Sequence, residues 1–217
     1  MNKVMLAATF LSVTLAYSAP SHAQFGGLMG GGGGATPEAV DQFLATALDA
    51  ETLISDSAWY LSSAVLAKEK FQALLARKNA ATKLQDPKEK AAELRSITAD
   101  ATAALANAVS DSNASKSLET ADKEKKAKIS TGVFNFVLGV LKDGDLVLQS
   151  SKLVSGVPSP AVATKVTQIK NVVSSIKNQM GNMQKAVTGM KKLGAAVGLK
   201  ALPTKSSDKP MMTSGEG

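Results

Sequence analysis

The sequence predicts an all-α protein, an elongated antiparallel bundle of four or five long helices, and three observations support this fold class. Between residues 162 and 197, apolar residues recur at alternating intervals of four and three positions. Residues 38–84 contain neither proline nor glycine, and their apolar residues return at helical spacing. Proline follows a helix-capping residue type at Pro37, Pro87 and Pro160, as is common in the first turn of a helix. Periodicity sustained over such lengths indicates long, packed helices.

The last of these helices is coiled-coil-like, because its apolar stripe continues for five heptads. We call this stripe the C-terminal seam, and Gly194 interrupts it once. Its side chains are Val162, Val166, Ile169, Val173, Ile176, Met180, Met183, Val187, Met190 and Val197. An isolated helix cannot bury such a stripe, so the seam must either close the core of the monomer or form an oligomer interface.

The chain is expected to begin with a cleaved secretory signal at residues 1–23. Lys3 is followed by a largely apolar run and by small residues before Ala23, and an uncleaved membrane anchor is the alternative. Residues 24–35 hold seven glycines and are expected to form a flexible linker. These features predict an exported bacterial protein, periplasmic or secreted.

The bundle domain is predicted to span residues 36–202. Residues 38–84 form either one bent helix or two, since the apolar pattern slips near residues 49–52. A new helix is expected from Asp86-Pro87, and residues 111–115 form a break. Residues 203–217 are expected to be a disordered tail.

Residues 129–157 form the most hydrophobic part of the chain after the signal. We expect a central helix that is buried on most sides. The alternative is a concealed hydrophobic hairpin, with residues 142–145 at its polar tip, that enters a membrane after a conformational change. Asp143 and Asp145 resemble part of a calcium loop, but the regular acidic spacing is missing, so no calcium site is assigned.

The charge distribution is strongly asymmetric. Residues 24–145 carry 14 basic and 16 acidic residues, whereas residues 146–207 carry nine lysines and no acidic residue. The lysines of the C-terminal helix either form a solvated face or contact an anionic surface. They are Lys165, Lys170, Lys177, Lys185, Lys191 and Lys192. Nucleic acid is not expected as a partner, because the chain has two arginines and no aromatic residue after Phe136.

The sequence offers no catalytic constellation. It contains no cysteine, and its one histidine, His22, lies within the predicted signal. We therefore assign no catalytic, cofactor-binding or metal-binding residue and expect neither an enzyme nor a small-molecule substrate. The expected function is that of an envelope scaffold, adaptor or assembly factor that binds a protein partner or self-associates through helix packing. The alternative is a membrane-active protein that uses residues 129–157 together with the lysine-rich helix.

Overall fold

The computed structural model describes residues 36–109, 118, 121–154 and 160–212, and within these residues the protein is all-helical. The helices are α1 (Pro37–Val65), α2 (Lys68–Thr82), α3 (Pro87–Val109), α5 (Lys123–Val154) and α6 (Pro160–Ala196). The predicted fold class, a bundle of long helices, is confirmed. The predicted signal, the glycine-rich linker and the break at 111–115 lie outside the described residues.

Local sequence signals define the starts of the first helices. The Thr36 hydroxyl caps α1 by accepting a hydrogen bond from the Ala39 backbone N–H at 3.2 Å, and Pro37 fills the first helical position. Asp86 does the same for α3, since its Oδ1 accepts from the Glu89 N–H at 2.9 Å. Both starts agree with the sequence-based prediction.

Residues 38–84 form two helices, but the break does not occur where the apolar pattern slips. α1 continues through residues 49–52 and ends at Val65, where Leu66 adopts an extended conformation. The slip arises because Ala50 and Ile54 belong to different core clusters, so α1 changes its packing partners there while its backbone remains helical.

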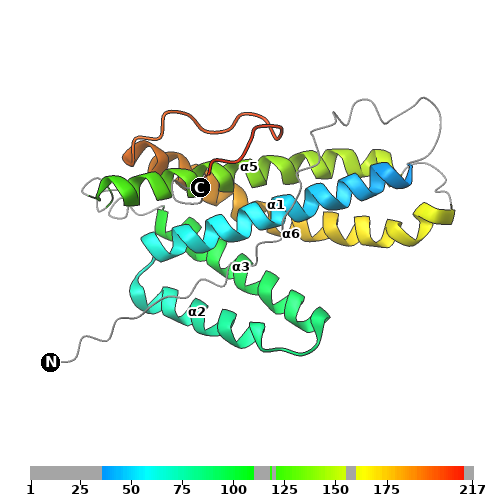
Figure 1. Ribbon diagram of the computed structural model, residues 1–217, viewed down its shortest axis with the longest axis horizontal. Helices are drawn as coiled ribbons and strands as arrows, with labels where there is room; N and C mark the ends of the chain where they lie inside the picture. The colour runs from blue at the N-terminus through cyan, green and yellow to red at the C-terminus, as the bar shows by residue number, and fades with distance from the viewer. Residues whose placement is uncertain (1–35, 110–117, 119–120, 155–159, 213–217) are drawn as a thin grey trace.

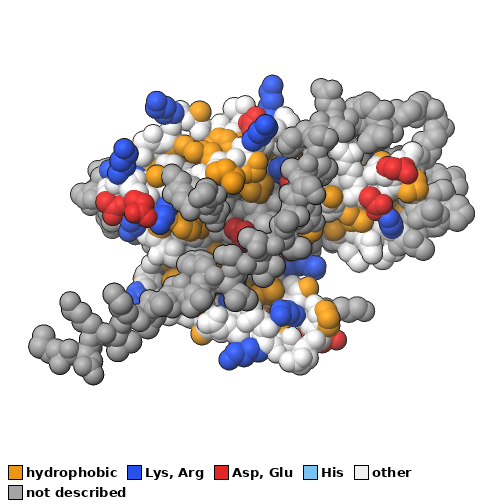
Figure 2. Space-filling view, viewed as in Figure 1, with side chains coloured by type: hydrophobic (Ala, Val, Ile, Leu, Met, Phe, Trp, Pro, Cys, Tyr) orange, Lys and Arg blue, Asp and Glu red, His pale blue; other side chains and the backbone are white. Residues whose placement is uncertain are grey.

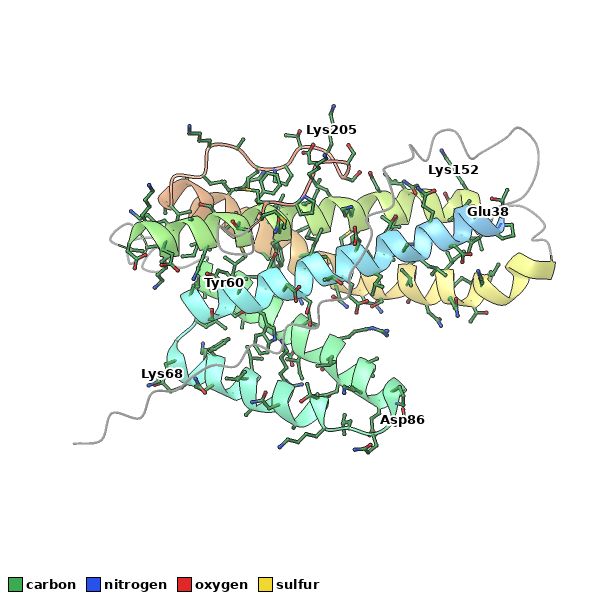
Figure 3. All side chains as sticks on the ribbon, viewed as in Figure 1. Glu38, Tyr60, Lys68, Asp86, Lys152 and Lys205 are labelled. Atoms are coloured by element: carbon green, nitrogen blue, oxygen red, sulfur yellow. The ribbon has the colours of Figure 1, made fainter. Side chains whose placement is uncertain are left out.

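Three long helices lie side by side along the long axis of the molecule (Figure 1). α5 runs antiparallel to both α1 and α6, so that Glu38 near the start of α1 and Lys152 near the end of α5 lie at the same end (Figure 3). α2 and α3 form a hairpin to one side of these helices, and α3 then crosses toward α6. In one half of the bundle the α2–α3 hairpin forms a second layer on the long helices. The other half consists of α1, α5 and α6 alone.

The bundle has two main core clusters, one in each half. At the half that α3 covers, the core includes Leu61, Leu105, Phe136, Met190 and Leu193. At the other half it includes Val40, Phe43, Leu146, Ile169 and Val173. A third, smaller cluster joins α2 to α3. The division between the two main clusters falls near Lys142 and Asp143 of α5.

The hydrophobic segment from residue 129 to residue 154 is one continuous stretch of α5, and no turn occurs at residues 142–145. The alternative expectation of a hairpin with its tip there is therefore wrong for this structure; residues 155–157 are outside the described part. Lys142 and Asp143 are themselves buried, at 7% and 5% exposure, because α1 packs against α5 on both sides of them. No described helix is both long and apolar enough to cross a membrane.

The predicted disordered tail also needs correction as far as Met212. Residues 203–212 return along α5 (Figure 1), where the Asn135 side chain donates to the Met211 carbonyl at 2.9 Å and accepts from the Met211 N–H at 2.8 Å. Asp208 accepts hydrogen bonds from the backbone N–H groups of Thr204 and Lys205. Composition suggested disorder, but polar side chains of α5 hold this segment in place. Residues 213–217 lie outside the described part.

Candidate functional site

The C-terminal seam lies inside the single chain. Its buried members are Ile169, Val173, Ile176, Met183, Met190 and Val197, and the half-buried ones are Val166, Met180 and Val187. The side chain of Val162 lies outside the described residues. The buried members belong to the two main core clusters, together with residues of α1, α3 and α5. In this structure the seam therefore acts as core, and it is not exposed to a second chain.

Five of the six lysines on α6 are exposed and share one side of the helix. We call Lys170, Lys177, Lys185, Lys191 and Lys192 the lysine face. Lys170, Lys177 and Lys191 are separated by multiples of seven residues, and Lys185 and Lys192 occupy the adjacent heptad position. No ion pair joins any of the five to another described residue, and α6 contains no acidic residue. The lysine face is therefore a stripe of uncompensated positive charge.

Lys165 differs from the other lysines of α6. It is half-buried and forms an ion pair with Asp41 of α1, so it links the two helices. Its predicted role as an anionic-surface contact is thus replaced by an interhelical role in this structure.

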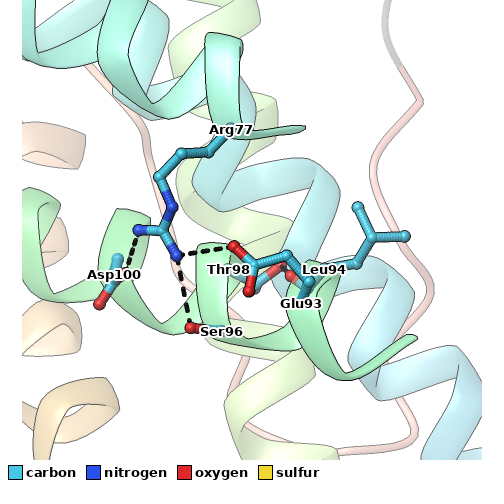
Figure 4. Close-up of polar contacts among 6 residues, drawn as sticks. All are labelled: Arg77, Glu93, Leu94, Ser96, Thr98 and Asp100. Atoms are coloured by element: carbon cyan, nitrogen blue, oxygen red, sulfur yellow. Dashed lines mark hydrogen bonds and ion pairs between the residues drawn. The ribbon is translucent and has the colours of Figure 1, made fainter. Parts of the chain in front are cut away.

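The lysine face contrasts with the charges elsewhere on the molecule. In Figure 2, basic and acidic side chains stand next to one another at both ends of the long axis. Figure 4 shows the same mixing on the α2–α3 hairpin, where Arg77 of α2 pairs with Asp100 at 2.6 Å and with Glu93 at 3.0 Å. These hydrogen bonds raise the pKa of Arg77, and the network holds α2 against α3. We assign a structural role to it.

The most unusual polar feature is the pair of charged residues buried within α5. Lys142 reaches an acidic partner, since its Nζ lies 3.6 Å from Oδ2 of Asp49. Asp143 has no hydrogen bond or ion pair with any described residue. Burial raises the pKa of the Asp143 carboxyl to about 7, and the nearby negative charge of Glu51 contributes further.

Asp143 lines a cavity of about 410 Å³ that lies between α1, α3, α5 and α6. We call it the Asp143 cavity. Its apolar lining comes mainly from α1 and α6, and Arg95 and Thr98 of α3 complete one wall. Arg95 and Glu51 are exposed and joined by a 3.2 Å ion pair, and Leu48 beside them is 51% exposed, so the cavity opens to solvent at this side.

The sequence reasoning found the lysines but missed Asp143 as a functional candidate. A usable signal was present, because an acid and a lysine interrupt the most hydrophobic helix of the chain. The sequence analysis expects a central buried helix over this segment, with a hairpin tip at residues 142–145 as the alternative, and neither interpretation assigns a role to Asp143. The structure also brings no group of three or more His, Cys, Asp or Glu residues into metal-binding proximity among the residues it describes.

No protein-family model, curated protein sequence or solved structure matches this chain.

Proposed function

We propose that this is an exported, non-enzymatic helical-bundle protein that acts as a scaffold, adaptor or assembly factor, and that its lysine face binds an elongated acidic surface on a protein partner. The supporting observation is the lysine face itself, five exposed lysines on one helix without an acidic neighbour in ion-pair contact. Export is proposed from the character of residues 1–23.

The dimensions of the lysine face favour a protein partner with an extended acidic surface. From Lys170 to Lys192 the helix rises roughly 33 Å, at about 1.5 Å per residue. A rigid row of charges on this scale is complementary to an acidic helix or to an extended acidic segment. Such complementarity mainly increases the association rate and specificity, and it weakens as salt screens the charges.

The membrane-active alternative has weaker support. The lysine face is also compatible with an anionic lipid surface, but the proposed inserting segment supplies Ile129, Val133 and Phe136 to the core with 0% exposure. Insertion would require α5 to leave α1 and α6, at the cost of most of the apolar burial in the bundle. We therefore treat lipid binding as an outcome that the experiment must distinguish.

Binding to defined anionic probes tests the proposal. The purified mature protein is titrated with poly-L-glutamate and, separately, with vesicles containing an anionic lipid, at low and at near-physiological salt. The variant K170E/K177E/K191E should weaken poly-L-glutamate binding by at least about tenfold. The control K68E/K70E/K83E reverses three exposed lysines on or next to α2 and should bind like the unmodified protein. Equal loss in both variants, or binding to vesicles with none to poly-L-glutamate, would contradict the proposal.

A further inference from the structure

The Asp143 cavity has properties that core packing alone does not explain. It lies where the two main core clusters meet and has a volume of about 410 Å³, and the exposed residues Leu48, Gln168 and Asn171 are part of its lining. This volume falls in the lower part of the range of about 300–1,000 Å³ that is typical of small-molecule sites. A largely apolar pocket that is open to solvent and reaches a buried carboxyl group has the form of a small-molecule binding site.

The negative charge of Asp143 indicates that a ligand of this cavity would be positively charged. Asp143 is 5% exposed and has no partner among the described residues. The carboxyl oxygens are not among the fully enclosed atoms that lack a partner, because they border the cavity. Burial of the side chain disfavours its charged form, and a cation bound in the cavity would offset this penalty. Glu51 does not compete for such a cation to the same extent, because Arg95 already neutralises it at the mouth. The site thus presents one unbalanced negative charge.

The remaining lining determines the shape and polarity of the ligand. Val172, Ile176 and Met183 of α6 present an apolar wall. Along the same helix the uncharged side chains of Gln168, Asn171, Ser175 and Gln179 can donate or accept hydrogen bonds. A mostly apolar body with a single positive group satisfies this combination.

We propose that the Asp143 cavity binds a small amphiphilic amine, whose ammonium group pairs with the Asp143 carboxylate and whose apolar body lies against α6. The proposal goes beyond the partner-binding function assigned to the lysine face and does not depend on it. It also revises the sequence-based expectation that no small molecule is bound, because the cavity forms only when four helices come together.

Binding should depend on pH through Asp143. The charged groups around its carboxyl are Glu51 and Asp49 of α1, Arg95 of α3 and Lys142 of α5, and the cavity wall of α6 carries no charge. With the pKa of Asp143 at about 7, the carboxyl is mostly ionised at pH 8 and mostly neutral at pH 6. A primary amine with a pKa near 10 stays protonated at both values, so its affinity should fall about tenfold from pH 8 to pH 6.

Isothermal titration calorimetry on the full mature protein tests the proposal, with phenethylamine, 1-naphthylmethylamine and n-hexylamine as probes. At pH 8 at least one amine should bind with a dissociation constant below about 1 mM. Its uncharged counterpart, such as 2-phenylethanol for phenethylamine, should bind at least about tenfold more weakly. The variant Asp143→Asn should remove this preference and the pH dependence. The control Asp100→Asn removes an acid on α3 outside the cavity and should change neither.

A second variant separates the volume of the cavity from its charge. Ser175→Leu fills the cavity from α6 while leaving Asp143 in place, so it should also weaken amine binding although the variant remains folded by circular dichroism. The proposal is wrong if none of the three amines binds at pH 8. It is equally wrong if the alcohol binds as tightly as the amine, or if Asp143→Asn retains full amine affinity.

Discussion

The most consequential single residue is Asp143, because its burial costs stability when its carboxyl is ionised. The unfolded carboxyl titrates near pH 4, whereas the folded one has a pKa of about 7. Between these values the unfolded state loses its proton first, so the free energy of unfolding falls as pH rises from about 4 to 7 and levels off above that. The protein therefore keeps at this position a group that weakens it at neutral pH.

Replacing Asp143 with asparagine should consequently stabilise the protein at pH 8, by about 4 kcal/mol at most for a pKa difference of about three units. At pH 4 the effect should nearly vanish, because the neutral carboxyl and the amide are similar in shape and polarity. Urea unfolding of the two proteins at both pH values measures the difference. The exposed control Asp100→Asn should change stability by no more than about 1 kcal/mol at either pH. Destabilisation by Asp143→Asn at pH 8 would show that the carboxylate has a partner.

Two glycines of α5, Gly139 and Gly144, should change the stability of the protein in opposite directions when replaced by alanine. A methyl group at Gly139 would lie 2.7 Å from Cγ1 of Ile54 and 3.1 Å from the Ala50 carbonyl oxygen, while one at Gly144 would meet no atom within 4 Å. Gly139→Ala should therefore destabilise the protein by about 1–3 kcal/mol through overpacking. Gly144→Ala should stabilise it by about 0.5–1 kcal/mol, because alanine is the better helix former. Thermal unfolding of both variants tests the pair, and equal shifts in the same direction would mean that α1 and α5 do not approach closely at Gly139.

The helix α6 illustrates which structural features the sequence predicts and which it does not. The heptad spacing predicted a long helix with one buried stripe, and α6 spans Pro160–Ala196 with the described stripe buried or half-buried. Whether that stripe faces its own chain or another is not encoded in the spacing, because both environments are equally apolar. Only the positions of α1, α3 and α5 distinguish them.

Substitution within the seam should accordingly unfold the monomer. Ile176→Asp places a charge among the core residues of α1 and α5 and should lower stability by more than about 3 kcal/mol, or prevent folding. Lys177→Asp, one position further along α6, changes an exposed side chain and should leave the helical circular dichroism signal unchanged. A folded monomer carrying Ile176→Asp would indicate that the seam serves an intermolecular contact.

The C-terminal segment shows why composition misled the sequence reasoning at this scale. Residues 203–212 are rich in polar residues, which is typical of disorder. In the fold they form hydrogen bonds with side chains of α5, for example between Met211 and Asn135, which are 76 residues apart in the sequence. The alternative of a hairpin tip at residues 142–145 fails for the same reason, whereas the leading expectation of a central helix agrees with α5. Charges and glycine favour a turn locally, and packing of α1 along α5 overrides that preference.

The contact between Asn135 and the C-terminal segment, residues 203–212, can be tested by substitution. Asn135→Ala removes both hydrogen bonds to Met211 and should release the residues that follow Asp208, while α5 keeps its helix because Asn135 is only half-buried. Hydrogen exchange of the Met211 amide should become at least about tenfold faster, and the amides of α6 should keep their protection. Unchanged protection at Met211 would show that other contacts hold the segment.

In the whole molecule, α6 contributes both to the lysine face and to the wall of the Asp143 cavity, through different residues. Positive charge is concentrated in the last third of the chain, where residues 146–207 contain nine lysines and no acid. Folding places six of these lysines on α6 and leaves five of them exposed along one side. The sequence therefore predicted the sign of the surface charge and the helix that carries it. The cavity depends on how α1, α3, α5 and α6 pack together, which the sequence pattern does not specify.

The proposed contact between the lysine face and an acidic protein partner can be tested inside cells. Site-specific photo-crosslinking from Gln184, an exposed α6 residue flanked by the lysines, in bacterial cells that produce the protein tests this contact. A discrete crosslinked protein of fixed mass is expected from Gln184 and none from the exposed control position Gln72 on α2. The Gln184 product should be lost in K170E/K177E/K191E. Crosslinks from Gln184 to lipid only, or a protein product that survives the triple substitution, would contradict the claim.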